Sequence, residues 1–235
     1  MIKHFLNFEW KQFFRSSYWQ KSIALNILMG FLALYFMLTF LVLGISIYPI
    51  LKKQFPESDP LIIVNGVLFY WFLGDLVMRF FLQKLPVMNI KPLLVLPIKR
   101  SKILNYVLGK SAISFFNFLP LFAIIPFGVI LIFEDYNTTT VLIWMLLMYV
   151  FTLIINFLNF IIEAKSAETE FSFLPIIALA SGLFALNYFN IISFSTFLGN
   201  AVDLILADSI LILIPFLILI GLYSINYFEL KKKLY

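Results

Sequence analysis

The chain has 235 residues, of which 63% are hydrophobic and only 12% are charged, and its mean hydropathy is +1.01. A soluble globular domain carries about 25% charged residues, so this composition excludes that class. Cysteine is absent and histidine occurs once, which excludes disulfides, thiolate metal sites and paired-histidine metal sites. The composition predicts a membrane protein, and we attribute the net charge of +5 to membrane topology rather than to nucleic-acid binding.

Residues 1–22 form a basic, aromatic segment ahead of the first apolar stretch. At helical spacing its apolar and basic side chains fall on opposite faces, and Trp10, Tyr18 and Trp19 suit the headgroup region. A helix of this kind lies in the plane of the membrane interface. We therefore expect an interfacial amphipathic helix, which either anchors the chain or moves with a neighbouring gate.

Six apolar stretches follow, each long enough to cross a hydrocarbon core about 30 Å thick, which requires about 20 helical residues. Because backbone amides in lipid must be hydrogen-bonded internally, we expect these stretches to be helices. The predicted fold class is all-α, with one six-helix transmembrane domain over residues 23–235. The expected spans are residues 23–50, 61–83, 113–133, 141–162, 171–194 and 204–228.

Lysine and arginine are distributed unevenly between the loops that these spans define. Fourteen of them fall on the side of the N-terminus, and Lys52 and Lys53 fall on the other side. By the positive-inside rule, the basic side is cytoplasmic. We therefore expect both termini in the cytoplasm, in agreement with an even number of spans.

The cytoplasmic loop between the second and third expected spans, residues 84–112, contains six of the seventeen lysines and arginines. Pro92 and Pro97 frame the short apolar run Leu93–Leu96. Proline favours a helix start just after it, so we expect a short helix, a break and a second helix that continues into the third span. Binding to anionic headgroups would explain the charge of this loop but not its proline-framed apolar run.

The sequence LLVLPIKRSKI at Leu93–Ile103 resembles the permease subunits of type-2 ABC exporters. Their first cytoplasmic loop holds a coupling helix that is often written L-P-[IV]-x-R, and Leu96, Pro97, Ile98 and Arg100 occupy the matching positions. The layout of an interfacial helix and six spans extends the similarity over all 235 residues. The chain is also similar to the N-terminal half of a longer bacterial family of uncharacterised ABC-2-like membrane proteins.

The resemblance implies a multi-pass permease subunit in the bacterial cytoplasmic membrane, with a separate ATP-binding cassette subunit that docks on residues 84–110. ATP hydrolysis belongs to that partner, so no cofactor is expected on this chain. Six spans make half a transporter, which implies a homodimer or a second permease half. The implied partner-coupling residues are Leu93, Leu94, Leu96, Pro97, Ile98 and Arg100.

The substrate is not implied by the resemblance, but spans with little charge and much phenylalanine favour a hydrophobic or amphipathic cargo. Two other functional classes remain open. One is a non-transporting membrane scaffold, such as a degenerate permease that binds partner proteins. The other is a secondary carrier.

No catalytic site is expected. Gly109-Lys110-Ser111 lacks the glycine that a phosphate-binding loop needs five residues earlier, where Leu104 stands. The single histidine, His4, lies outside the spans, so no intramembrane Ser-His pair can form. The chain is therefore not expected to bind nucleotide or to be an enzyme.

Four polar residues inside the expected spans are candidates for a helix pair or a pathway. Asp75 and Arg79 are four residues apart on the second span, so they share a helix face and can pair. Arg79 is close enough to the cytoplasmic end that we expect it to snorkel. Asn156 and Asn159 on the fourth span are expected to join helices by hydrogen bonds.

Overall fold

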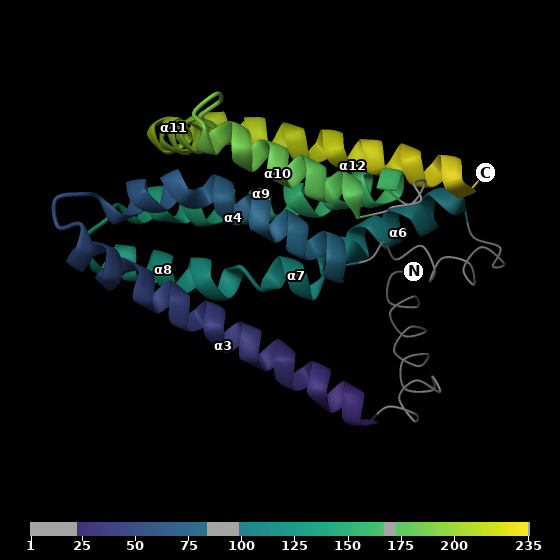
Figure 1. Ribbon diagram of the computed structural model, residues 1–235, viewed down its shortest axis with the longest axis horizontal. Coiled ribbons are helices and arrows are strands. Elements are labelled where there is room, and N and C mark those ends of the chain that lie inside the picture. The colour runs from purple at the N-terminus through teal and green to yellow at the C-terminus, as the bar shows by residue number, and fades with distance from the viewer. Residues whose placement is uncertain (1–22, 84–98, 167–172, 235) are drawn as a thin grey trace.

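A computed structural model of the chain describes residues 23–83, 99–166 and 173–234 (Figure 1). All regular structure in these residues is helical, which confirms the all-α prediction. The interfacial helix predicted over residues 1–22 lies outside them. The helices are α3 (Ile23–Gln54), α4 (Pro60–Leu82), α6 (Arg100–Ala112), α7 (Phe115–Phe118), α8 (Leu121–Phe133), α9 (Thr138–Ser166), α10 (Leu174–Tyr188), α11 (Phe194–Ala207), the 3-10 helix η2 (Ser209–Ile212) and α12 (Leu213–Leu234).

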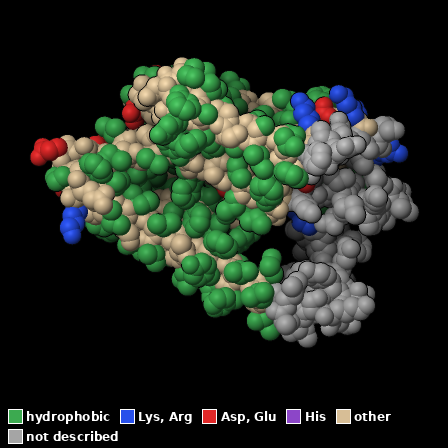
Figure 2. All heavy atoms as spheres, in the orientation of Figure 1, with side chains coloured by type: hydrophobic (Ala, Val, Ile, Leu, Met, Phe, Trp, Pro, Cys, Tyr) green, Lys and Arg blue, Asp and Glu red, His purple; other side chains and the backbone are tan. Residues whose placement is uncertain are grey.

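Most of these helices run back and forth along one long axis (Figure 1). At one end the chain turns from α3 to α4 and from α8 to α9, and we call this the acidic end for the side chains of Glu57, Asp59, Glu134 and Asp135. At the opposite end α6 begins and α12 finishes, and we call this the basic end for Arg100, Lys102, Lys231 and Lys232. Figure 2 shows charged side chains at the two ends of this face and hydrophobic side chains over its middle.

In the described residues, five helical segments are long and apolar enough to cross a membrane. Helices α10 and α11 are shorter apolar helices of 15 and 14 residues. Helix α11 lies across the bundle at the acidic end, where Figure 1 views it almost end-on. The prediction of an all-helical chain with several helices able to cross a membrane is thus confirmed, whereas the predicted count of six spans is not. The five segments are Ile27–Gln54, Pro60–Leu82, Phe115–Phe133, Thr138–Ser166 and Ser209–Lys232.

The expected fifth and sixth spans have the wrong boundaries. Helix α10 stops at Tyr188, and the chain turns through Asn190, whose positive φ of 54° an asparagine tolerates better than most residues. Residues 204–207, expected to begin the sixth span, instead finish α11. Helix α11 ends at Ala207, and Asp208 follows it. The carboxylate of Asp208 accepts a hydrogen bond from the backbone N–H of Ile210 and so caps the start of η2.

The expected third span is also interrupted. Helix α6 ends at Ala112 instead of continuing into the membrane, and α7 is a single turn that begins after Ser114. Pro120 then separates α7 from α8, because proline has no N–H to continue the ladder of hydrogen bonds. The prediction of one continuous helix from the loop into the third span is therefore wrong.

The buried apolar side chains form two larger cores, a main one near the acidic end and a second near the basic end, and a small third cluster of Leu76, Ile155 and Ile176. In the main core, Phe127 on α8 packs with Trp144 and Leu147 on α9. In the second, Leu104 on α6 packs with Phe160 on α9, beside the end of α12. Helix α9 contributes to both cores and is the most buried of the candidate spans.

Helix α3 packs on α8 near the acidic end and diverges from the bundle toward its own N-terminus (Figure 1). The two helices cross closely at Gly44, where a Cβ atom would overlap the backbone of Ala123. Beyond this crossing, side chains such as Phe31 and Leu34 are exposed on α3. Helix α3 is therefore packed on the bundle near the acidic end and is mostly exposed toward its N-terminus.

Candidate functional site

The candidate site is built around Arg79, which lies in the last turn of α4 and is completely buried. Its Nε donates to the Oδ2 of Asp75 over 2.8 Å, so the predicted i,i+4 pair is present. The carboxylate side chain is 14% exposed, and the guanidinium side chain is 0% exposed. The expectation that Arg79 snorkels to the interface is wrong, because its remaining donors are directed into the protein.

The guanidinium replaces a hydrogen bond that proline removes from the third span. In an α-helix, the carbonyl of Phe116 would accept from the N–H of residue 120, which is Pro120 and has none. The Nη2 of Arg79 donates to this carbonyl over 2.7 Å instead. Buried carbonyl groups in a membrane must find a donor, so the break in the helix and the buried arginine depend on each other.

Asn117 connects this arginine to the end of α6. Its Oδ1 accepts from the Nη1 of Arg79 over 2.6 Å. Its Nδ2 donates to the carbonyls of Ser111 and Ala112, at 3.0 and 3.1 Å, which are among the last carbonyls of α6. The joint between α6 and α7 is thus held to α4 through one amide side chain, which is completely buried.

Gln83, the residue that follows α4, extends the same contacts to α9. Its Oε1 accepts from Arg79 over 3.2 Å, and its Nε2 donates to the Oδ1 of Asn156 over 2.6 Å. The backbone carbonyl of Gln83 accepts a longer bond of 3.4 Å from Asn159. The predicted joining of helices by Asn156 is therefore confirmed. Asn159 contributes less, because its Oδ1 is buried without a hydrogen-bond partner among the described residues.

We refer to these contacting groups as the Arg79 network. The network contains one cation and one carboxylate, joined by amide and carbonyl groups, and no nucleophile is paired with a base in it. No group of His, Cys, Asp and Glu that could hold a metal ion occurs in the described part of the chain. Its chemistry is therefore that of a fixed connection between helices. Its members are Asp75, Arg79, Gln83, Ser111, the carbonyl of Phe116, Asn117, Asn156 and Asn159.

Sequence analysis found half of this network and missed the other half. It identified the Asp75–Arg79 spacing and the two asparagines of α9, but not Gln83, Ser111 or Asn117. The sequence did carry one signal for this site. Asn117 is a single amide side chain within an apolar stretch, and it lies three residues before Pro120.

Of the predicted partner-coupling residues, only Arg100 lies in the described part of the chain. Leu93, Leu94, Leu96, Pro97 and Ile98 lie outside the described residues. Arg100 is the first residue of α6 and is exposed at the basic end. The Arg79 network contacts both sides of residues 84–98, through Gln83 before them and the end of α6 after them.

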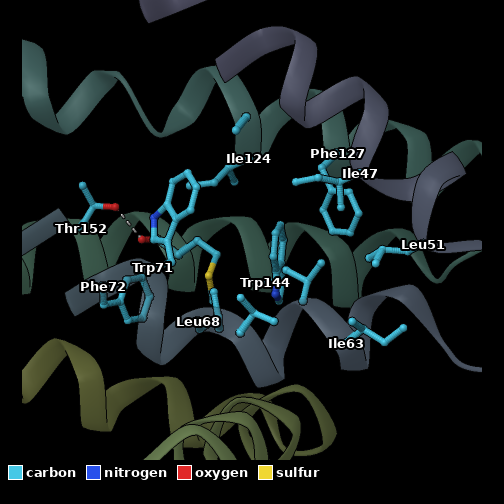
Figure 3. Close-up of a pocket in the computed structure, with 14 residues that line it drawn as sticks. Ile47, Leu51, Ile63, Leu68, Trp71, Phe72, Ile124, Phe127, Trp144 and Thr152 are labelled. Atoms are coloured by element: carbon cyan, nitrogen blue, oxygen red, sulfur yellow. Dashed lines mark hydrogen bonds between the residues drawn. The ribbon is translucent and has the colours of Figure 1, made fainter. Parts of the chain in front are cut away.

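A second feature, which the sequence did not predict, is an apolar cavity of about 240 Å³ among α3, α4, α8 and α9 (Figure 3). The indole rings of Trp71 and Trp144 and the rings of Phe72 and Phe127 form much of its wall, together with aliphatic side chains. Apolar residues that line a cavity look the same in a sequence as those that face lipid, which explains why it was missed.

The chain was compared with known proteins. The sequence model of a family described as a family of unknown function (DUF5687) matches residues 9–235. No curated protein and no solved structure matches the chain. The family match includes every helix described above as well as the basic loop.

Proposed function

We propose that this chain, which belongs to the DUF5687 family, is the membrane-spanning permease subunit of an ABC-type exporter in the bacterial cytoplasmic membrane. A separate ATP-binding cassette subunit docks on residues 84–110 and supplies the energy. A second copy of the chain, or a second permease half, completes the transporter. The cargo is hydrophobic or amphipathic.

The proposal includes six membrane passes with both termini in the cytoplasm. Helix α10 is the additional pass, because it runs along the bundle beside α4 and α9 (Figure 1). Its 15 residues give about 22 Å of helix, and local thinning of the bilayer accommodates so short a pass. The excess of lysine and arginine at the basic end supports a cytoplasmic position for that end.

The observation that carries the proposal is the connection between the basic loop and the interior of the bundle. Gln83 and the end of α6 flank the predicted docking segment, and both belong to the Arg79 network. Helix α6 also packs on α9 and α12 through Leu104 and Leu108. A force on the loop therefore reaches α4, α7 and α9 through short, buried hydrogen bonds rather than through a flexible joint.

The proposed mechanism follows from this connection. ATP-driven closure of the docked subunit moves the start of α6, and Asn117 passes that movement to Arg79 and so to α4. Since α7 is one turn between two breaks, α6 and α8 can change their relative angle there. The helices then rock between two access states, as small displacements at a packed interface can produce.

The test is purification of the tagged protein in mild detergent, with mass spectrometry of every protein that remains bound. We expect an ATP-binding subunit that is lost in Arg100→Glu and Leu94→Asp. Lys53→Glu, a matched charge reversal at the acidic end, should retain it. The chain purified alone in several detergents, with no ATPase, would instead favour the non-transporting scaffold.

Coupling is tested separately from docking with Asn117→Ala. We expect this variant to retain the ATP-binding subunit, because the substituted side chain is buried far from the exposed start of α6. Stimulation of ATP hydrolysis by the permease should fall several-fold. Full stimulation in a folded Asn117→Ala variant would contradict a coupling role for the Arg79 network.

A further inference from the structure

The apolar cavity has walls that offer hydrocarbon and aromatic carbon and almost no polar group. Its hydroxyl group, on Thr152, already donates to the carbonyl of Met148 over 2.9 Å. The indole N–H of Trp144 already donates to the Oδ1 of Asn65 over 3.0 Å. A polar ligand would leave its own groups unpaired in this space, at a considerable cost in free energy. The cavity therefore selects an apolar occupant.

The size of the cavity admits part of a flexible chain. A cavity of about 150 Å³ lined by aliphatic and aromatic side chains stays dry and binds benzene. The present cavity, at about 240 Å³, is larger and equally apolar. It can hold several methylene groups of an alkyl chain.

The most exposed residues of the cavity wall are Val67 and Trp71, both on α4. Phe40 of α3 contacts the ring of Trp71 edge-on, with ring centroids 5.5 Å apart. Both helices are candidate membrane spans, so a lipid chain in the bilayer can reach these side chains at the edge of the cavity.

We propose that this cavity binds one acyl chain of a membrane lipid, with the Phe40–Trp71 pair at its mouth. The hydrophobic effect alone gives no preference for the cavity, because lipid tails are as apolar as its walls. The preference comes from packing, since atoms that line a void lose dispersion contacts that a methylene chain restores. A flexible chain can adjust its torsion angles to fill such a space.

The consequence for transport concerns the class of cargo. If the acyl-chain site is the cargo site, the cargo is a lipid or a molecule that carries an alkyl chain, and this step rests on the proposed function. The binding site itself does not require an ATP-binding subunit. The two claims can therefore fail independently.

The experiment uses the purified full chain, without any ATPase, in vesicles of phosphatidylethanolamine and phosphatidylglycerol. The probe is a phospholipid with a photoactivatable diazirine near the end of one acyl chain. After irradiation, mass spectrometry locates the labelled residues. We expect labels on Trp144 and Met148, which are each 2% exposed and so cannot be reached by lipid outside the cavity.

Two variants fill the cavity from different walls, and one provides a matched control. Val64→Phe on α4 and Ile124→Phe on α8 place a larger ring in the space, so both should reduce labelling of Trp144 and Met148 several-fold. Ile62→Phe makes a similar change two residues from Val64 at a site that is 58% exposed and outside the wall, so labelling should not change. Thermal unfolding of the three variants establishes that each is folded.

Three results would overturn the inference. The first is labelling confined to outward-facing residues. The second is labelling of the cavity residues that both filling variants leave unchanged. The third comes from a second arm with a photoactivatable free fatty acid of equal chain length. Labelling of the cavity by the fatty acid but not by the phospholipid would show that the occupant is not a bilayer lipid.

Discussion

The Arg79 network and the apolar cavity both involve α4 and α9, but the contacts around them differ. Near the basic end, Arg79 binds the α6–α7 joint and Gln83 binds α9 through bonds of 2.6–2.7 Å. Near the acidic end, an apolar space of about 240 Å³ lies among α3, α4, α8 and α9, and one hydrogen bond, from Trp144 to Asn65, joins α9 to α4. The first region is held by several directional bonds, and the second mainly by apolar contacts.

This difference has a physical basis in the membrane. A buried polar group there has no water as an alternative partner, so a directional bond resists displacement. Apolar contacts in lipid are exchanged for equally apolar contacts with acyl chains, so they resist displacement less. We infer that α4, α9 and the α6–α7 joint move as one unit near the basic end, and that the helices around the cavity are displaced more easily relative to one another. The following variants test this inference, from the largest expected effect to the smallest.

Arg79→Met should have the largest effect. It leaves the carboxylate of Asp75 without its cation, and it leaves the carbonyl of Phe116 without a donor. Breaking a buried ion pair by removing one partner costs about 3 kcal/mol or more. Thermal unfolding in detergent should show this loss.

A double variant distinguishes loss of the pair from loss of the arginine itself. Asp75→Leu combined with Arg79→Met removes the uncompensated carboxylate, so it should be more stable than Arg79→Met alone. If the double variant were no more stable than Arg79→Met, the unpaired carboxylate of Asp75 would not account for the loss, and the carbonyl of Phe116 without its donor would be the main cause.

Gly44→Ala should have the next largest effect, and it acts on the opposite region. The added Cβ would overlap the backbone of Ala123, where α3 crosses α8 beside the cavity. Overpacking of this kind typically costs about 1–3 kcal/mol. Gly30→Ala on the same helix is the control, because nothing lies within 4 Å of the added Cβ. Equal stabilities of the two variants would contradict a close crossing.

Asn156→Leu and Asn159→Leu compare a satisfied and an unsatisfied amide three residues apart on α9. Asn156 accepts a 2.6 Å bond from Gln83, so its loss should cost about 1 kcal/mol, within the range for membrane hydrogen bonds. Asn159 makes one bond of 3.4 Å and leaves its Oδ1 unpaired, so leucine there should be nearly neutral or stabilising. A larger loss for Asn159→Leu would show that its oxygen binds a group outside the described contacts.

Much of the fold follows from the sequence, because long apolar stretches have few alternatives in lipid. The second and fourth spans and the i,i+4 pair of Asp75 and Arg79 all follow from length and spacing. The breaks do not follow so directly. The stretch around Asp208 stays apolar on both sides, so hydropathy alone does not reveal that α11 ends there and α12 begins at Leu213.

The missed half of the candidate site has a specific cause. The sequence shows that Pro120 removes a hydrogen bond from the third span, but not which side chain donates in its place. The carbonyl that loses its donor belongs to Phe116, and the nearest candidate donor in the spans was the buried Arg79. The cavity could not have been predicted in the same way, since it depends on the angle between α3 and α4 and not on any residue type.

Tyr136→Phe should have the smallest effect, because the hydrogen bond of Tyr136 lies outside both regions, at the acidic end. The hydroxyl of Tyr136 donates to Asp59 over 2.7 Å at an exposed site, and a bond of this kind contributes about 0.5–1.5 kcal/mol at most.

Partial burial, assisted by this bond and by the negative charge of Asp59, raises the pKa of the Tyr136 phenol above its ordinary value. The unfolded chain therefore loses this proton first as the pH rises past about 10. Stability that depends on the protonated phenol is complete below that pH and is lost above it. The parent protein should lose stability more steeply than Tyr136→Phe when unfolding is measured between about pH 9 and 11. Parallel curves for the two proteins would show that the phenol at the acidic end contributes nothing that depends on its proton.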